Sequence, residues 1–205
     1  MKKFKLRKDV SKTWNGMTLY RVEALVDIPW HDVKAGDLGG WVENENNLAD
    51  DAWVFGEAIV CGKARVSGEA VVCEKARVGE KARVSGKALI SGNAIVYGRA
   101  QVSGRAQVAG NAEIYGKAEV LGQAEVIGDK IEEQKELTFI RAEDFYDITI
   151  TPNFMKIGCQ FHTRKAWWGF TDKEIEKMDG EKALKFWRKY KPILMAICEE
   201  KREGY

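Results

Sequence analysis

Histidine, long apolar runs and a strong net charge are all scarce in this sequence. The 205 residues include two histidines, and 33 Lys or Arg residues nearly balance 31 Asp or Glu residues, which leaves a net charge of +2. So small a charge does not imply attraction of the whole protein to nucleic acid or membrane, although a local patch remains possible. No apolar run approaches the roughly 20 residues of a membrane span. We therefore expect no membrane partner.

Cysteine is also sparse. The four cysteines, Cys61, Cys73, Cys159 and Cys198, are scattered and lack the density of a disulfide framework. The segment MKKFKLRKDV lacks the apolar core of a secretory signal. Together these features predict a reducing compartment, the cytoplasm.

What the sequence does contain is a repeat of six residues. Residues 51–128 divide into thirteen hexads, each with Ala second and Val or Ile fourth, and glycine is sixth in all but two, which end in Glu74 and Glu80. A helix needs a period near 3.6 and does not tolerate frequent glycine. A short strand followed by a corner fits the repeat, and hexapeptide repeats of this kind build β-helices.

The hexads resemble the hexapeptide-repeat family, whose chains wind a left-handed parallel β-helix. The resemblance implies three hexads per turn, so that residues 18 apart stack. The preceding LGGWVENENNLAD supplies two degenerate hexads with Val42 and Leu48 as their inward residues. We therefore predict a mainly β protein with a single-stranded left-handed β-helix of about five turns over residues 39–128.

Two aperiodic segments flank the repeats, and we interpret both as caps on the open ends of the solenoid. Residues 1–38 contain Asn15-Gly16, a hairpin signal, and predict an N-terminal β-hairpin cap. Residues 129–205 predict an α+β module with two strands around Pro152-Asn153 and helices at about 172–178 and 181–199. Thr171 and Glu174 form a capping-box pattern before the first helix, and Pro192 predicts that the second helix kinks or restarts there.

A second resemblance covers nearly the whole chain. The segments NGMTLYRVEAL and VKAGDLGGWVENENNLADDAWVFG, followed by hexads, are similar to phage and prophage proteins often labelled polymer-forming or putative transferase. The resemblance implies a phage-encoded accessory or anti-defence factor in the host cytoplasm, which binds a host protein or a small anion without catalysis.

Stacking by 18 residues sorts the outward side chains into three faces. One face is basic, and its cations with a neighbouring hydroxyl column predict an anion-binding surface; a solvated face is the alternative. Duplex nucleic acid is not an expected partner, because cations at the sheet repeat do not match its phosphate spacing, whereas a small nucleotide fits better. The candidate residues are Lys63, Arg65, Lys81, Arg83, Ser85 and Arg99.

A second face is apolar, and a monomer seldom exposes such a surface. We expect a neighbouring subunit or the C-terminal module to cover it, and by family analogy we expect a homotrimer. The interface candidates are Trp53, Phe55, Val71, Leu89 and Ile127.

Enzymatic activity is the main alternative, because acyltransferases and zinc carbonic anhydrases share the resembled fold. The anhydrases need several histidines on zinc, and no hexad contains one. Acyl transfer would have to use His31 or His162 as its base. Cys159 and His162 form one close Cys/His pair, which is too few ligands for a metal site. We expect no cofactor, and a structural spacer or virion component is the remaining alternative.

Overall fold

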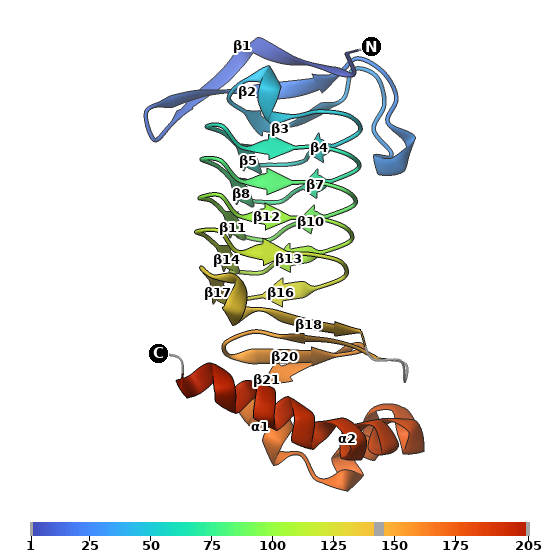
Figure 1. Cartoon of the computed structure of the whole chain (residues 1–205). Coiled ribbons are helices and arrows are strands. Elements are labelled where there is room, and N and C mark those ends of the chain that lie inside the picture. Colours follow the sequence, from blue (N-terminus) through green and yellow to red (C-terminus); the bar gives the residue numbers. More distant parts are fainter. Residues whose placement is uncertain (1, 142–145, 204–205) are drawn as a thin grey trace. The chain divides into compact units, whose positions relative to one another are not determined.

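The computed structural model describes residues 2–141 and 146–203, with side chains up to residue 199. The chain forms two compact units, residues 1–134 and residues 135–205. The first unit is a β-solenoid of about five turns that begins with a hairpin, and the second combines a four-stranded sheet with helices (Figure 1).

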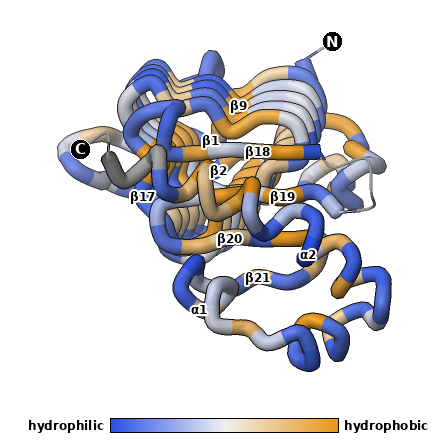
Figure 2. Tube along the Cα trace, turned by 60° about the horizontal axis from the view of Figure 1, so that its bottom comes forward, coloured by the Kyte–Doolittle hydropathy of each residue, from blue (hydrophilic) through white to orange (hydrophobic). Residues whose placement is uncertain are grey.

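The solenoid has three parallel sheets, and each hexad adds one short strand to one of them. The strands are β3 (Leu38–Val42), β4 (Trp53–Val54), β5 (Ile59–Val60), β6 (Arg65–Val66), β7 (Val71–Val72), β8 (Arg77–Val78), β9 (Arg83–Val84), β10 (Leu89–Ile90), β11 (Ile95–Val96), β12 (Gln101–Val102), β13 (Gln107–Ala109), β14 (Glu113–Ile114), β15 (Glu119–Val120), β16 (Glu125–Ile127) and β17 (Lys130–Ile131). Sheet A has the order β3-β5-β8-β11-β14-β17, sheet C the order β15-β12-β9-β6, and sheet D the order β16-β13-β10-β7-β4. Figure 2 shows the corners of successive turns superimposed along the solenoid.

The predicted 18-residue turn is confirmed by the strand register. Val60 pairs with Val78 in sheet A, Val66 with Val84 in sheet C, and Val54 with Val72 in sheet D. The two degenerate hexads are also confirmed, since Val42 pairs with Val60 and a bridge joins Leu48 to Val66.

The solenoid also continues past the last glycine hexad at residue 128. Strand β17 (Lys130–Ile131) pairs with β14, and here Ile114 meets Ile131 after 17 residues instead of 18. The hexad pattern alone gives no sign of this last strand, because its inward residue arrives one position early.

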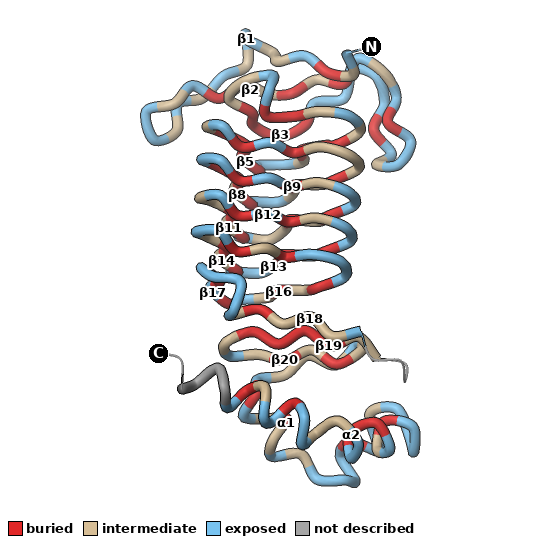
Figure 3. The backbone as a smooth tube through the Cα atoms, in the orientation of Figure 1, coloured by how far each residue is buried: buried red, intermediate tan, exposed pale blue. Residues whose placement is uncertain are grey.

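Each hexad folds in this way because of two inward residues and one corner residue. The aliphatic fourth residue is 0% exposed in every hexad, and the second-position alanines from Ala58 to Ala124 are 0–1% exposed (Figure 3). At most corners an alanine amide donates across a tight turn, as from Ala64 to the Cys61 carbonyl at 3.3 Å. The intervening Gly62 has a φ of +65°, which a glycine adopts without steric cost.

Glycine is favoured at these corners because most of the stacked corners approach closely. A Cβ on Gly86, whose φ is +71°, would lie 2.8 Å from the Gly104 carbonyl oxygen. Glu74 and Glu80 occupy the same corner position with φ values of +60° and +54°. Their backbone is therefore strained, at a cost of about 1–2 kcal/mol for each residue.

The N-terminal hairpin consists of β1 (Phe4–Trp14) and β2 (Met17–Ala24), joined at Asn15 and Gly16 as predicted. Strand β2 pairs antiparallel with β3, so that the hairpin extends sheet A. Leu19 is fully buried in one cluster with Trp41, Ile59 and Cys61 of that sheet. The hairpin therefore covers part of the outer face of sheet A.

A charged network fixes this contact. The Trp41 indole donates to the Glu57 carboxylate at 2.9 Å, and Lys12 and Arg21 lie 4.2 and 4.3 Å from the centre of a Trp41 ring. Arg21 and Lys12 also pair with Glu57. The hydrogen bond from Trp41, together with both cations, lowers the pKa of Glu57.

The second unit holds four antiparallel strands in sequential order: β18 (Thr138–Arg141), β19 (Asp147–Ile150), β20 (Phe154–Ile157) and β21 (Gln160–Thr163). The prediction of two strands was wrong in number: the hairpin around Pro152-Asn153 is present, and a strand lies on each side of it. In both outer strands three of the four residues are half-buried and the last is exposed, so burial does not alternate along them.

Two helices follow, α1 (Arg164–Gly169) and α2 (Asp172–Glu203). The Thr171–Glu174 capping box is confirmed, and the predicted helix break is found at Asp179 and Gly180. Non-helical backbone within α2 is confined to those two residues in the described chain, so the helix does not restart at Pro192. Buried Arg164 donates to the carbonyls of Pro152 and Cys198 at 2.9 Å and thereby joins α1 to the hairpin and to α2.

Candidate anion-binding surface of the solenoid

The predicted cations gather on sheet C and on the corner that precedes it, and we call this surface the basic face. Arg65 and Arg83 are directly paired neighbours on β6 and β9, and both side chains are exposed. Strand spacing places their backbones about 4.8 Å apart. Ser85, which follows β9, is half-buried.

The corner residues form a second column beside the arginines. The backbone amide of Lys63 donates to the Glu80 carbonyl at 2.6 Å, that of Lys81 to Gly98 at 2.9 Å, and that of Arg99 to Gly116 at 2.7 Å. Lys63, Lys81 and Arg99 therefore stack one turn apart. Lys117 adds a fourth cation to this column, beyond the predicted candidates.

The corner column lines a shallow open groove. Its floor is made by Gly62, Gly98 and Gly116, which carry no side chains, and Glu80 takes the place of glycine between them. The four cations of the column lie along the same groove. One carboxylate thus lies among four positive side chains.

The cations of the basic face outnumber the one carboxylate that lies beside their corner column, that of Glu80. Over residues 2–141 and 146–199, no ion pair or side-chain hydrogen bond engages Lys63, Arg65, Lys81, Arg83, Arg99 or Lys117. By contrast, Lys87 on the next corner pairs with Glu69 at 2.9 Å. Stacked like charges repel one another, so the basic face carries an electrostatic cost that a bound anion would relieve.

The predicted apolar face corresponds to sheet D, and one of its residues needs no outside cover. Trp53 is 1% exposed, although we expected a subunit or the C-terminal module to cover it. Within its own unit, the indole lies so close to Gly39 of β3 that a Cβ there would be 2.9 Å from it. The other four candidates, Phe55, Val71, Leu89 and Ile127, are half-buried.

The histidines named for acyl transfer lie in different units and have different surroundings. His31 belongs to a short 3-10 turn (Pro29–His31), and its Nε2 is buried with no hydrogen-bond partner in the described chain. His162 packs edge-on against Trp167 and Phe170, with ring centres 5.3 and 5.0 Å apart. These contacts assign His162 to the aromatic packing of its unit.

The thiols differ mainly in burial. Burial raises the pKa of Cys61 to about 11 and also raises that of Cys73, whereas Cys159 is exposed. Within the described ranges, no three His, Cys, Asp or Glu residues are grouped closely enough to hold a metal ion. Among the helices that the structure describes, none combines the length and the apolar character needed to cross a bilayer.

Neither a protein-family model nor a curated protein matches this sequence in the comparisons.

Proposed function

We propose that the protein is a non-catalytic binding protein and that the basic face of its solenoid binds a small polyanion, such as a nucleotide. The observation that carries this proposal is the set of six exposed cations in two stacked columns, none of which forms an ion pair in the described chain. Guanidinium and ammonium groups at fixed spacing form charge-assisted hydrogen bonds with phosphate oxygens. The stacked strands and corners below them hold the Cα atoms of the cations at a regular spacing before the anion arrives, which lowers the entropic cost of binding.

Several finer features of the proposal follow from the resemblances. We propose that the solenoid is single-stranded and left-handed, which its 18-residue turns and its positive-φ corners support. We also propose a homotrimer joined through the half-buried apolar residues of sheet D, and a role as a phage accessory or anti-defence factor in the host cytoplasm. Native mass spectrometry of protein from infected cells would test the subunit number and would detect a retained ligand.

The binding experiment titrates the protein with ATP and with inorganic triphosphate by calorimetry at low and high salt. Arg65→Glu combined with Arg83→Glu should weaken binding of both anions by at least about tenfold, because charge-assisted hydrogen bonds are lost. The melting temperature should barely change, since both side chains are exposed. Affinity in the parent protein should fall as salt rises.

A matched control separates a binding site from general charge attraction. Lys75→Glu with Arg105→Glu changes the net charge equally, at exposed corner residues outside the basic face. This control should keep most of the affinity. Equal loss in both double variants, or no binding of either anion by the parent, would refute the proposed site.

A further inference from the structure

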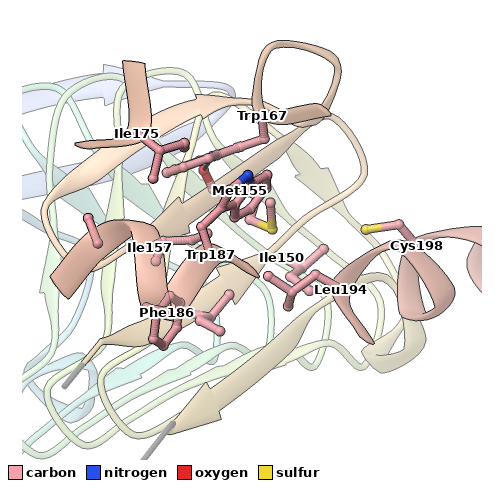
Figure 4. Close-up of a cluster of buried hydrophobic side chains, with 11 residues drawn as sticks. Ile150, Met155, Ile157, Trp167, Ile175, Phe186, Trp187, Leu194 and Cys198 are labelled. Atoms are coloured by element: carbon pink, nitrogen blue, oxygen red, sulfur yellow. Dashed lines mark hydrogen bonds between the residues drawn. The ribbon is translucent and has the colours of Figure 1, made fainter. Parts of the chain in front are cut away.

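The C-terminal unit contains a cavity of about 190 Å³ between its sheet and its helices. Aromatic and aliphatic side chains form most of its wall, and Figure 4 shows Trp167, Trp187, Phe186, Ile157 and Ile175 in this cluster. A dry cavity of about 150 Å³ is large enough to hold benzene. The space therefore accommodates a ligand group of about the size of one aromatic ring.

Two glycines are sequence neighbours of residues that line this cavity. Gly158 has a φ of +57°, and a Cβ there would lie 2.7 Å from the Tyr146 ring. Gly180 adopts a φ of +66° and a ψ of −157°, a region open almost exclusively to glycine. The second glycine breaks α2 next to Asp179, whose carboxylate accepts a hydrogen bond from the Tyr146 hydroxyl. An unusual backbone thus holds a carboxylate at the rim.

The charge of the lining favours a cation. Asp179 is the one Asp, Glu, Lys or Arg side chain that lines the cavity in the described chain. Tyr146 is its one hydrogen-bond partner among the described residues, so its carboxylate can accept further donors. The rings of Trp167 and Phe186 add negative faces, which attract cations, while Lys182 and Lys191 already lie 5.1 and 5.2 Å from ring centres of Tyr146 and Trp187.

We propose that this cavity binds a small organic cation, namely an ammonium group attached to a compact apolar or aromatic group. The apolar part lies among the rings, and the ammonium donates to Asp179. The proposal does not depend on the anion-binding function of the solenoid, because every lining residue belongs to the C-terminal unit.

The test uses full-length protein labelled with 5-fluorotryptophan and three ligands of one shape: benzylammonium, benzyl alcohol and benzoate. Fluorine NMR should show shifts of the Trp167 and Trp187 signals, with benzylammonium binding most tightly and benzoate most weakly. The signals are assigned with single Trp→Phe variants. Benzoate binding as tightly as benzylammonium, or unshifted Trp167 and Trp187 signals with all three ligands, would overturn the proposal.

Two variants sharpen this test. Asp179→Asn retains an oxygen that can accept from Tyr146 and should weaken benzylammonium binding about fivefold, while benzyl alcohol binding stays the same. Asp172→Asn is the control, because it removes an equal charge from the same helix where Asp172 pairs with Arg188 outside the cavity. Equal loss of benzylammonium affinity in both variants contradicts the role of Asp179.

Ala183→Leu fills the cavity from α2 and should abolish the shifts caused by all three ligands. Far-UV circular dichroism checks that this variant folds. Unchanged ligand shifts in a folded Ala183→Leu variant would place the binding site elsewhere.

Discussion

The solenoid and the C-terminal unit bury their cores in different ways. From Val54 to Val126 the solenoid uses alanine, valine and isoleucine at repeated inward positions, nearly all of them fully buried. The C-terminal unit combines tryptophan, phenylalanine, isoleucine, methionine, leucine and cysteine from strands and helices. Equivalent inward positions in successive turns are filled by similar small side chains. The irregular core of the C-terminal unit leaves space, such as the cavity beside Trp167 and Trp187.

The type of core packing determines where each unit can recognise a ligand. A solenoid whose interior is filled by small aliphatic residues has its varied chemistry only on its outer faces, where the columns of Lys63 and Arg65 lie. The C-terminal unit has chemical variety inside, with a carboxylate and four aromatic rings around one cavity. The proposed anion and cation sites follow from these two kinds of packing.

The substitution with the greatest expected effect on stability lies in the irregular core of the C-terminal unit. Leu194 is fully buried in the C-terminal cluster, and Leu194→Ala should lower the free energy of unfolding of that unit by about 3 kcal/mol, because apolar contacts are lost and a new void forms. Hydrogen exchange of the Ile148 and Ile150 amides measures this loss. The neighbouring Ile193 is 53% exposed, and Ile193→Ala should cost less than about 0.5 kcal/mol. Similar costs for both variants would mean that this core is not packed as described.

The next prediction tests the tight stacking of the solenoid corners. Gly86→Ala should destabilise the solenoid by about 2 kcal/mol, because an alanine resists positive φ and its Cβ would clash with the backbone at Gly104. The loss is measured by hydrogen exchange of the Ser85 and Ser103 amides, which bond to neighbouring turns. Gly169→Ala is the control in the C-terminal unit, where a Cβ would meet no atom within 4 Å. It should leave stability unchanged or raise it by less than about 1 kcal/mol.

The same contrast explains how much could be predicted from the sequence. The turns, the inward residues and the stacking of Arg65 on Arg83 were predictable, because one hexad determines all the others. Strand β17 was missed since its spacing departs from the repeat, and strands β18 and β21 were missed because their half-buried residues give no clear alternation.

The sites divide in the same way. The 18-residue period predicted the residues of the basic face one by one. Lys117 occupies the same column but was not among the predicted candidates. The intramolecular burial of Trp53 depends on the approach of Gly39, and the cavity depends on where the break in α2 places Asp179. Contacts of this kind come from tertiary packing between distant segments, which a local pattern does not encode.

A smaller effect on stability is expected at Glu80, which replaces the usual corner glycine of the solenoid. Glu80→Gly should stabilise the solenoid by about 1 kcal/mol, because glycine adopts the φ of +54° without strain. Chemical denaturation measures the change. Glu80→Ala is the control, since it removes the carboxylate but keeps a Cβ at the strained corner, and it should give no comparable gain. If both variants stabilise equally, loss of the Glu80 side chain and not relief of backbone strain accounts for the gain.

The smallest effect concerns two tyrosines, one in each unit, whose pKa values are both raised to about 12. For Tyr97 the main cause is burial, because its ring lies over Gly79 of the neighbouring turn. For Tyr146 burial is also the first cause, and the hydrogen bond to Asp179 adds to it. Asp179→Asn should therefore lower the pKa of Tyr146 toward 10 and leave that of Tyr97 unchanged.

The sign of the associated pH effect follows from these shifts. The folded state favours the neutral phenol, so the stability that Tyr97 contributes is fully present below pH 10 and is lost as the pH rises from 10 toward 12. Tyr97→Phe should remove that part of the alkaline loss, since phenylalanine does not ionise. Tyrosinate absorbance in the near ultraviolet follows the ionisation of both tyrosines. The Tyr97→Phe and Tyr146→Phe variants assign one titration step each. If Asp179→Asn changes neither titration step, the carboxylate does not raise the pKa of Tyr146. The contrast between a pKa raised by burial alone and one raised also by a charged partner would then be wrong.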